Sequence, residues 1–188
     1  MKKASIAALV LLCALIPVVG GAQATPAPDT HVYDDAAMHF VAPADAVLLG
    51  ARPEHPTLAT LSQDLQPIAQ WVVGKPPHMT FIVLQMESFA GSLDGFDSTF
   101  ENSLRADNSA TLVKHRELTK LSNGMPVYFV EVTQGAGFDT QKLFAYLWID
   151  GQRGVVLGVS CGLGIIDADG AKQLLASVSA VRYPNDSP

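Results

Sequence analysis

The second half of the chain contains four segments in which apolar residues dominate or alternate with polar ones, and each segment is bounded by turn residues. This pattern predicts β-strands over residues 111–121, 127–132, 143–149 and 154–161. Asn123-Gly124 and Asp150-Gly151 are dipeptides typical of tight turns between strands. Because connections this short join only antiparallel neighbours, we expect the four strands to form an antiparallel meander.

Two helices are predicted, one before this meander in the sequence and one after it. The first has apolar residues at spacings of three, four and four, which places them on one stripe, and Ser92 is its expected N-cap. The second follows Asp167 or Asp169 as N-cap, and Pro184 ends the ordered chain. The stripe residues are Leu93, Phe96, Phe100 and Leu104 in the first helix, and Ala171, Leu174, Leu175, Val178 and Val181 in the second.

The first half of the chain predicts further strands over residues 38–42, 47–49 and 79–86, the last with the apolar density of a central strand. Residues 57–73 are ambiguous between helix and strand. Leucines at 58, 61 and 65 have helical spacing, but Pro67 lacks the backbone N–H that a continuous helix needs. We therefore predict a short helix from 58 to about 66, followed by a strand over 68–73.

The N-terminus has the pattern of a secretory signal. Lys2 and Lys3 precede an apolar run over residues 4–19, and Ala22-Gln23-Ala24 offers small residues for cleavage. We predict a signal peptide over 1–24, a disordered tail over 25–32, a single domain over 33–184 and a C-terminal tail over 185–188. Leu12 before Cys13 argues against a lipid anchor, and no later segment has the length and apolarity of a membrane span. The expected location is the periplasm or the exterior, without membrane insertion after cleavage.

Charge and cysteine content narrow the expected partners. After loss of residues 1–24, 10 of the 12 basic residues remain against 18 acidic ones, a net charge of −8. This charge repels nucleic acid, which we exclude as a partner.

Cys161 is the single cysteine after residue 24, so an intramolecular disulfide is excluded and the core must stabilise the fold. We expect Cys161 to be a buried apolar group, with a reactive or dimer-forming thiol as the alternative.

Three features of the sequence suggest catalysis or metal binding when the residue types alone are considered. Gly158-Val159-Ser160-Cys161-Gly162 matches the nucleophile elbow of esterases, but that mechanism requires a histidine after the serine, and His115 is the last one. The five histidines, His31, His39, His55, His78 and His115, include no pair at ligand spacing. Asp167-Ala168-Asp169-Gly170 resembles part of a calcium loop but lacks its remaining acidic ligands. We assign no catalytic, metal or cofactor residue.

Aromatic residues are the other candidates for binding. Tyr146 and Trp148 share one face of a predicted strand, and Tyr128 is placed opposite them on the neighbouring strand. Such a row is expected to lie in the core under a helix, and Trp71 is a further aromatic candidate for binding. The alternative is an exposed groove offered to a partner.

The order of these elements resembles the PsbP-like and Mog-like superfamily. The resemblance rests on short segments spread over most of the chain after the signal: Tyr33-Asp34, Phe40-Val41-Ala42-Pro43, the strand near 80–86, Asn123-Gly124-Met125-Pro126-Val127, Asp150-Gly151 and Val181-Arg182-Tyr183-Pro184. It implies an α+β fold, an antiparallel sheet flanked by helices in an α/β/α sandwich. It also implies a binding or assembly factor, since PsbP is an extrinsic photosystem subunit and Mog proteins bind a small GTPase. No residue role carries over.

The sequence therefore predicts an exported domain without catalytic activity that binds a protein partner or a small ligand at the cell envelope. An envelope hydrolase is the alternative, using Ser160 or a carboxylate and histidine site, and a metal carrier is a third possibility. The sequence leaves the partner, the pathway and the oligomeric state open.

Overall fold

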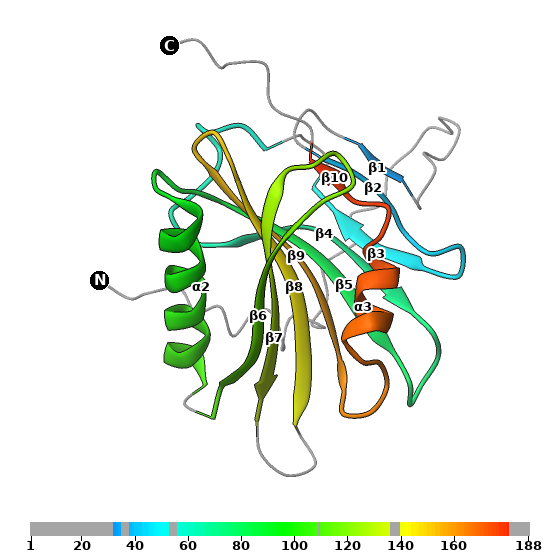
Figure 1. Ribbon diagram of the computed structural model, residues 1–188. Coiled ribbons are helices and arrows are strands. Elements are labelled where there is room, and N and C mark those ends of the chain that lie inside the picture. The colour runs from blue at the N-terminus through cyan, green and yellow to red at the C-terminus, as the bar shows by residue number, and fades with distance from the viewer. Residues whose placement is uncertain (1–31, 35–37, 53–55, 109, 136–139, 181–188) are drawn as a thin grey trace.

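The computed structural model describes residues 32–34, 38–52, 56–108, 110–135 and 140–180. Within this part of the chain, two helices and two antiparallel sheets form one α+β domain (Figure 1). The large sheet consists of β3 (Val47–Ala51), β4 (Gln66–Val73), β5 (Thr80–Ser88), β6 (Leu112–Lys120), β7 (Pro126–Gln134), β8 (Gln141–Asp150) and β9 (Arg153–Gly162). The small sheet consists of β1 (Val32–Asp34), β2 (Met38–Val41) and β10 (Ser179–Ala180), with β2 in the middle.

The large sheet has the order β3-β4-β5-β9-β8-β7-β6, and every neighbouring pair is antiparallel. The strands β6 to β9 form the predicted meander. Its last strand returns beside β5, in an unbroken register that runs from Thr80 opposite Cys161 to Ser88 opposite Arg153. The predicted meander is thus confirmed, and this pairing joins it to the earlier strands.

Both faces of the large sheet are covered. Helix α2 (Leu93–Asp107) packs on one face, and helix α3 (Ala168–Leu174) lies with the small sheet on the other (Figure 1). Two apolar clusters result, one per face. The α2 side holds Phe96, Phe100, Leu104, Val130, Leu147 and Val156, and the α3 side holds Met38, Phe40, Trp71, Phe129, Phe144, Trp148, Leu157 and Leu175, among others.

Helix α2 begins and faces the sheet as its sequence predicts. The Ser92 hydroxyl accepts a hydrogen bond from the Gly95 N–H at 3.1 Å, which satisfies one of the free donors of the first turn. Of the predicted stripe, Phe96, Phe100 and Leu104 are buried, whereas Leu93 is half-buried.

The contact between α2 and β9 depends on the absence of a side chain at Gly154. A Cβ atom there would overlap the ring of Phe96, which is fully buried and therefore has no free space to move into. Because Gly154 has no side chain, the Phe96 ring has room against β9, and the helix can lie this close to the sheet.

The predicted helix over 58–66 is wrong, because these residues form turns. The Thr57 N–H donates to Thr60 Oγ1 at 2.9 Å, and the Ser88 N–H donates to the Ser62 carbonyl at 2.7 Å. Threonine and serine side chains that bond to nearby backbone groups, as Thr60 does here, compete with helical hydrogen bonds. Strand β4 begins at Gln66 and includes Pro67, where the pairing with β5 shifts register before Ala69.

The second predicted helix is too long. Helix α3 ends at Leu174, and bonds from the Ala176 N–H to Gln173 O and from the Val178 N–H to Leu175 O turn the chain toward β10. Leu175 and Val178 are buried as predicted, because the turn keeps them on the side of the core. The predicted positions of Val181 and Pro184 lie outside the described residues.

Strand β1 starts at Val32, one residue before the predicted start of the domain. The predicted signal peptide and C-terminal tail lie outside the described residues. Among the described residues, neither helix has the length and apolar character that crossing a bilayer requires.

Replacing the central side chain of the α2 interface tests this packing. Phe100→Ala should lower the free energy of unfolding by about 3 to 5 kcal/mol, because it leaves a cavity between the helix and the sheet. Asn102→Ala, at an exposed position of the same helix, is the control and should change little. Urea denaturation of both variants measures the difference, and equal stabilities would contradict the assignment of this face.

Candidate binding surface

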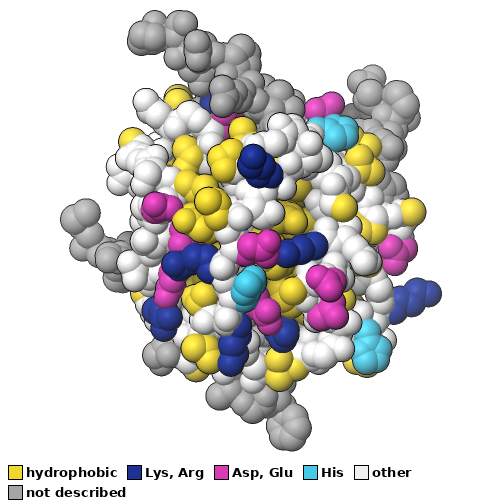
Figure 2. Space-filling model, viewed as in Figure 1, with side chains coloured by type: hydrophobic (Ala, Val, Ile, Leu, Met, Phe, Trp, Pro, Cys, Tyr) yellow, Lys and Arg dark blue, Asp and Glu magenta, His cyan; other side chains and the backbone are white. Residues whose placement is uncertain are grey.

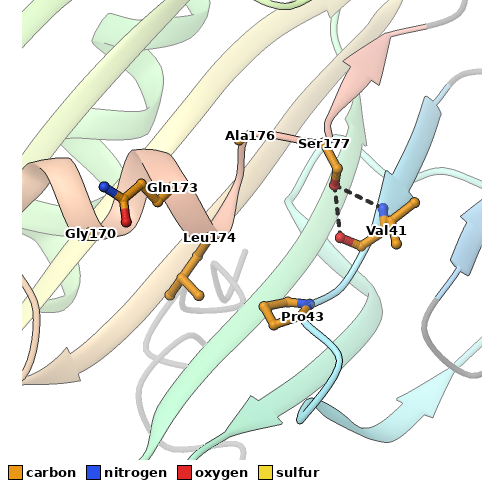
Figure 3. A pocket seen from close by; sticks show the side chains of 7 residues that line it. All are labelled: Val41, Pro43, Gly170, Gln173, Leu174, Ala176 and Ser177. Carbon is orange, nitrogen blue, oxygen red and sulfur yellow. Dashed lines mark hydrogen bonds between the residues drawn. The ribbon is translucent and has the colours of Figure 1, made fainter.

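An open hollow of about 370 Å³ lies where the end of β2 meets the end of α3 (Figure 3). Leu174 and Pro43 lie on opposite sides of it, and Gln173 adds an amide that has no hydrogen-bond partner among the described residues. Apolar groups thus predominate, with few polar ones. The lining residues are Val41, Pro43, Gly170, Gln173, Leu174, Ala176 and Ser177.

Helix α3, which borders the hollow, is short, and hydrogen bonds fix the chain at its start and after its end. At its start, Asp167 Oδ1 accepts a bond from the Gly170 N–H at 2.9 Å, as expected for an N-cap. After its end, Ser177 Oγ donates to the carbonyl of Val41 at 2.8 Å and accepts from the Val41 N–H at 3.0 Å (Figure 3). The side chain thereby replaces a backbone partner two positions beyond Ser179 and His39, the last residues of the β2–β10 pairing.

An ion pair connects α3 to the large sheet. Lys172 Nζ lies 2.9 Å from Glu117 Oε2 on β6 and 4.6 Å from the ring centre of Phe129 on β7. This hydrogen bond holds the pKa of Glu117 below and that of Lys172 above its usual range. Lys142 repeats the arrangement, 2.8 Å from Glu131 and 5.4 Å from the ring centre of Phe144. Cations above aromatic faces are favourable contacts.

Figure 2 shows that basic and acidic side chains alternate on the surface over the region of β6 and β7. Arg116 on β6 reaches α2. Its guanidinium lies 3.0 Å from the carboxylate of Asp97, which is buried, and it also pairs with Glu101. Burial raises the pKa of Asp97, and Arg116 opposes that shift.

The predicted aromatic row is only partly right. Tyr146 and Trp148 share one face of β8 as predicted, and that face is the α3 side. Phe129, however, stands opposite Tyr146, at 5.3 Å between ring centres. Tyr128 lies on the other face, where its hydroxyl donates to Asp94 at 2.7 Å. Trp148 is buried in the core, as predicted for the row, and Trp71, the further binding candidate, is buried as well.

The candidate nucleophile Ser160 is not assembled with a base. Its side chain faces the α2 side of β9, with Gln141 Oε1 at 3.5 Å as its polar neighbour. His115 lies on β6, separated from β9 by β7 and β8, and its partner Glu117 belongs to the opposite face of the sheet. His39 pairs with Asp34 at 3.8 Å, and His78 lies in the turn before β5.

Metal ligands do not converge among the described residues, and His31 and His55 lie outside them. Asp167 has the predicted role of a helix cap. Cys161 is buried with 3% exposure, and desolvation raises the pKa of its thiol. Since the thiolate is the reactive form, this environment makes Cys161 an apolar core residue.

Glu87 is a buried carboxyl that the sequence reasoning missed. It lies on β5 with 4% exposure, and no hydrogen bond or ion pair joins it to another described residue. Desolvation, with a smaller contribution from the charge of Asp64, raises the pKa of Glu87 to about 7. A charged residue in an otherwise apolar strand is the signal that could have drawn attention to it.

No family model matches this chain, and the search of curated proteins found no match either.

The buried carboxyl makes stability depend on pH. The pKa of Glu87 is higher in the folded than in the unfolded chain, so its contribution favours folding at low pH and is lost as pH rises through about 7. Glu87→Gln stays neutral and should therefore be more stable than the wild type at pH 8, by about 1 to 3 kcal/mol, with little difference at pH 4.

Chemical denaturation at a series of pH values measures this difference. Asp64→Asn is the matched control, because it leaves Glu87 in place and removes only the smaller influence on its pKa. Parallel pH profiles for the wild type and Glu87→Gln would contradict the assignment.

Proposed function

We propose that this protein is an exported binding domain, without catalytic activity, that takes an apolar group of a protein partner or small ligand into the hollow between β2 and α3. The signal pattern of residues 1–24 supports export to the periplasm or the exterior. The α/β/α arrangement, with α2 on one face and α3 on the other, supports membership of the PsbP-like and Mog-like superfamily.

The observation that carries the proposal is the hollow itself. Its volume of about 370 Å³ falls within the range of ligand sites, and its walls are mostly apolar, with the amide of Gln173, which has no hydrogen-bond partner in the described part of the chain. Val41, at its rim, is 40% exposed although it is a large apolar residue on a strand. An apolar surface that remains open to water in a folded domain gains free energy when a partner covers it.

The hydrolase alternative is less well supported. Ser160 lacks a neighbouring base among the described residues, and a serine hydroxyl is a weak nucleophile without one. For the metal carrier, the described residues contain no cluster of side chains that could hold a metal ion.

A neutral apolar probe tests the hollow. N-phenyl-1-naphthylamine should bind the purified protein saturably, with a rise in fluorescence, and Val41→Glu should weaken binding at least about fivefold because it places a charge at the rim. Leu118→Glu is the control, since Leu118 is an exposed apolar strand residue that does not line the hollow. Equal effects of the two substitutions would overturn the assignment.

The same preparation tests the alternatives. We expect no turnover of p-nitrophenyl acetate, and turnover that Ser160→Ala abolishes would establish the hydrolase instead. Elemental measurement of the purified protein should find no stoichiometric zinc or copper, and a full equivalent of either would favour the metal carrier.

A further inference from the structure

The hollow lies at the end of β2 beside which β1 begins. In the register of the small sheet, Val32 stands opposite Val41, which lines the hollow (Figure 3). Because β1 is antiparallel to β2, its backbone, followed back from Asp34 to Val32, points in the direction in which β2 continues to Pro43. Pro43 also lines the hollow. The segment that precedes Val32 is therefore attached at the rim of the hollow.

Exposed apolar surface continues from β1 to the hollow. The N–H and the carbonyl of Val41 both bond to Ser177, so Val32 and Val41 form a pair without backbone hydrogen bonds between them. Side chains approach most closely in pairs of this kind, and both lie on the same face of the sheet. The two valines are 36% and 40% exposed. A segment that leads up to Val32 thus meets an apolar surface immediately.

The composition of residues 25–31 suits such a surface. The segment reads Thr-Pro-Ala-Pro-Asp-Thr-His, and its prolines are Pro26 and Pro28. An extended chain spans about 3.5 Å per residue, so Pro28 can reach about 14 Å from Val32 and Pro26 about 21 Å. Proline and alanine lose almost no side-chain entropy on burial, and the proline ring already fixes φ. Ordering this segment therefore costs less free energy than ordering an average one.

The C-terminal segment is attached elsewhere. Strand β10 pairs Ser179 with His39 and Ala180 with Met38, so it runs along β2 away from Val41. The chain after Ala180 consequently continues from the opposite end of β2. Of the two terminal segments, the one before Val32 is thus the occupant that the register favours.

We propose that residues 25–31 cover the hollow when no ligand is bound, with their prolines against Leu174 and Pro43, so that a ligand must displace them. This inference rests on the proposed function, since the hollow is the binding site that the segment regulates. A short tether gives an effective concentration of the order of millimolar, so a weak contact is enough for partial occupancy. A hollow that is free about one third of the time binds its ligand about threefold more weakly than an open one.

Charges on the segment test this regulation. The double variant Pro26→Asp with Pro28→Asp should bind N-phenyl-1-naphthylamine at least about threefold more tightly than the wild type, because carboxylates do not enter an apolar hollow and so leave it free. Pro184→Asp with Pro188→Asp is the matched control, since it adds the same charge to the other terminal segment, and it should not change the affinity. Mass spectrometry establishes that all variants share one N-terminus. Equal affinities throughout, or equal tightening in both double variants, would overturn the inference.

A pair of cysteines locates the segment without any probe. Ala27→Cys with Gln173→Cys should form an intramolecular disulfide under mild oxidation, since Gln173 is exposed and lines the hollow. Asn185→Cys with Gln173→Cys should stay reduced, because a tether of the same length then starts at the opposite end of β2. Cys161 is buried and adds little background. Circular dichroism establishes folding, and a folded Ala27→Cys, Gln173→Cys protein that stays reduced or links into dimers at about 1 µM, far below the effective concentration, would overturn the inference.

The two experiments separate this inference from the proposed function. A disulfide together with a lack of probe binding by every variant would support the covered hollow and overturn the proposed function. Probe binding of equal affinity in all variants, without the disulfide, would overturn the inference and leave the proposed function supported.

Discussion

The antiparallel pairing of β5 with β9 is the contact on which the rest of the structure depends. It joins residues about 70 positions apart in an unbroken register, and it places β9 in the middle of the sheet, where all but its last residue is buried. Because β6 to β9 run as a meander, this pairing fixes β6 at the outer edge. The chain must therefore cross from the centre of the sheet to that edge after β5, and α2 makes the crossing over one face. The opposite face is left for α3 and the small sheet.

Local patterns predict the elements whose partners are near in sequence. The meander, its turns and the stripe of α2 follow from alternation, turn dipeptides and helical spacing, since each of these depends on a few adjacent residues. The segment before β4 fails because its leucine spacing imitates a helix while Thr57, Thr60 and Ser62 satisfy the backbone as turns. The end of α3 fails because the buried residues Leu175 and Val178 fit a turn as well as a helix. Strands as short as β1 and β10 have no pattern of their own.

The candidate surface could not be predicted because its parts are distant in sequence. Val41 and Ser177 are separated by 136 positions, and only the β2–β10 pairing brings them together. Tyr128 shows the same limit on a smaller scale: its face depends on a register that places it opposite Leu147, so Phe129 takes the place beside Tyr146. The core roles of Trp148 and Cys161 follow more simply from the apolar sequence around them.

The close approach at Gly154 links two positions that are far apart in the chain. A larger residue at 154 would require a smaller one at 96, and a smaller residue at 96 would leave a void unless 154 filled it. Each substitution alone is unfavourable, whereas the exchange of volume between them conserves the packing. In related chains, the two sites should therefore covary, with their side-chain volumes inversely correlated. Such a correlation would identify the crossing point of α2 on the sheet from an alignment alone.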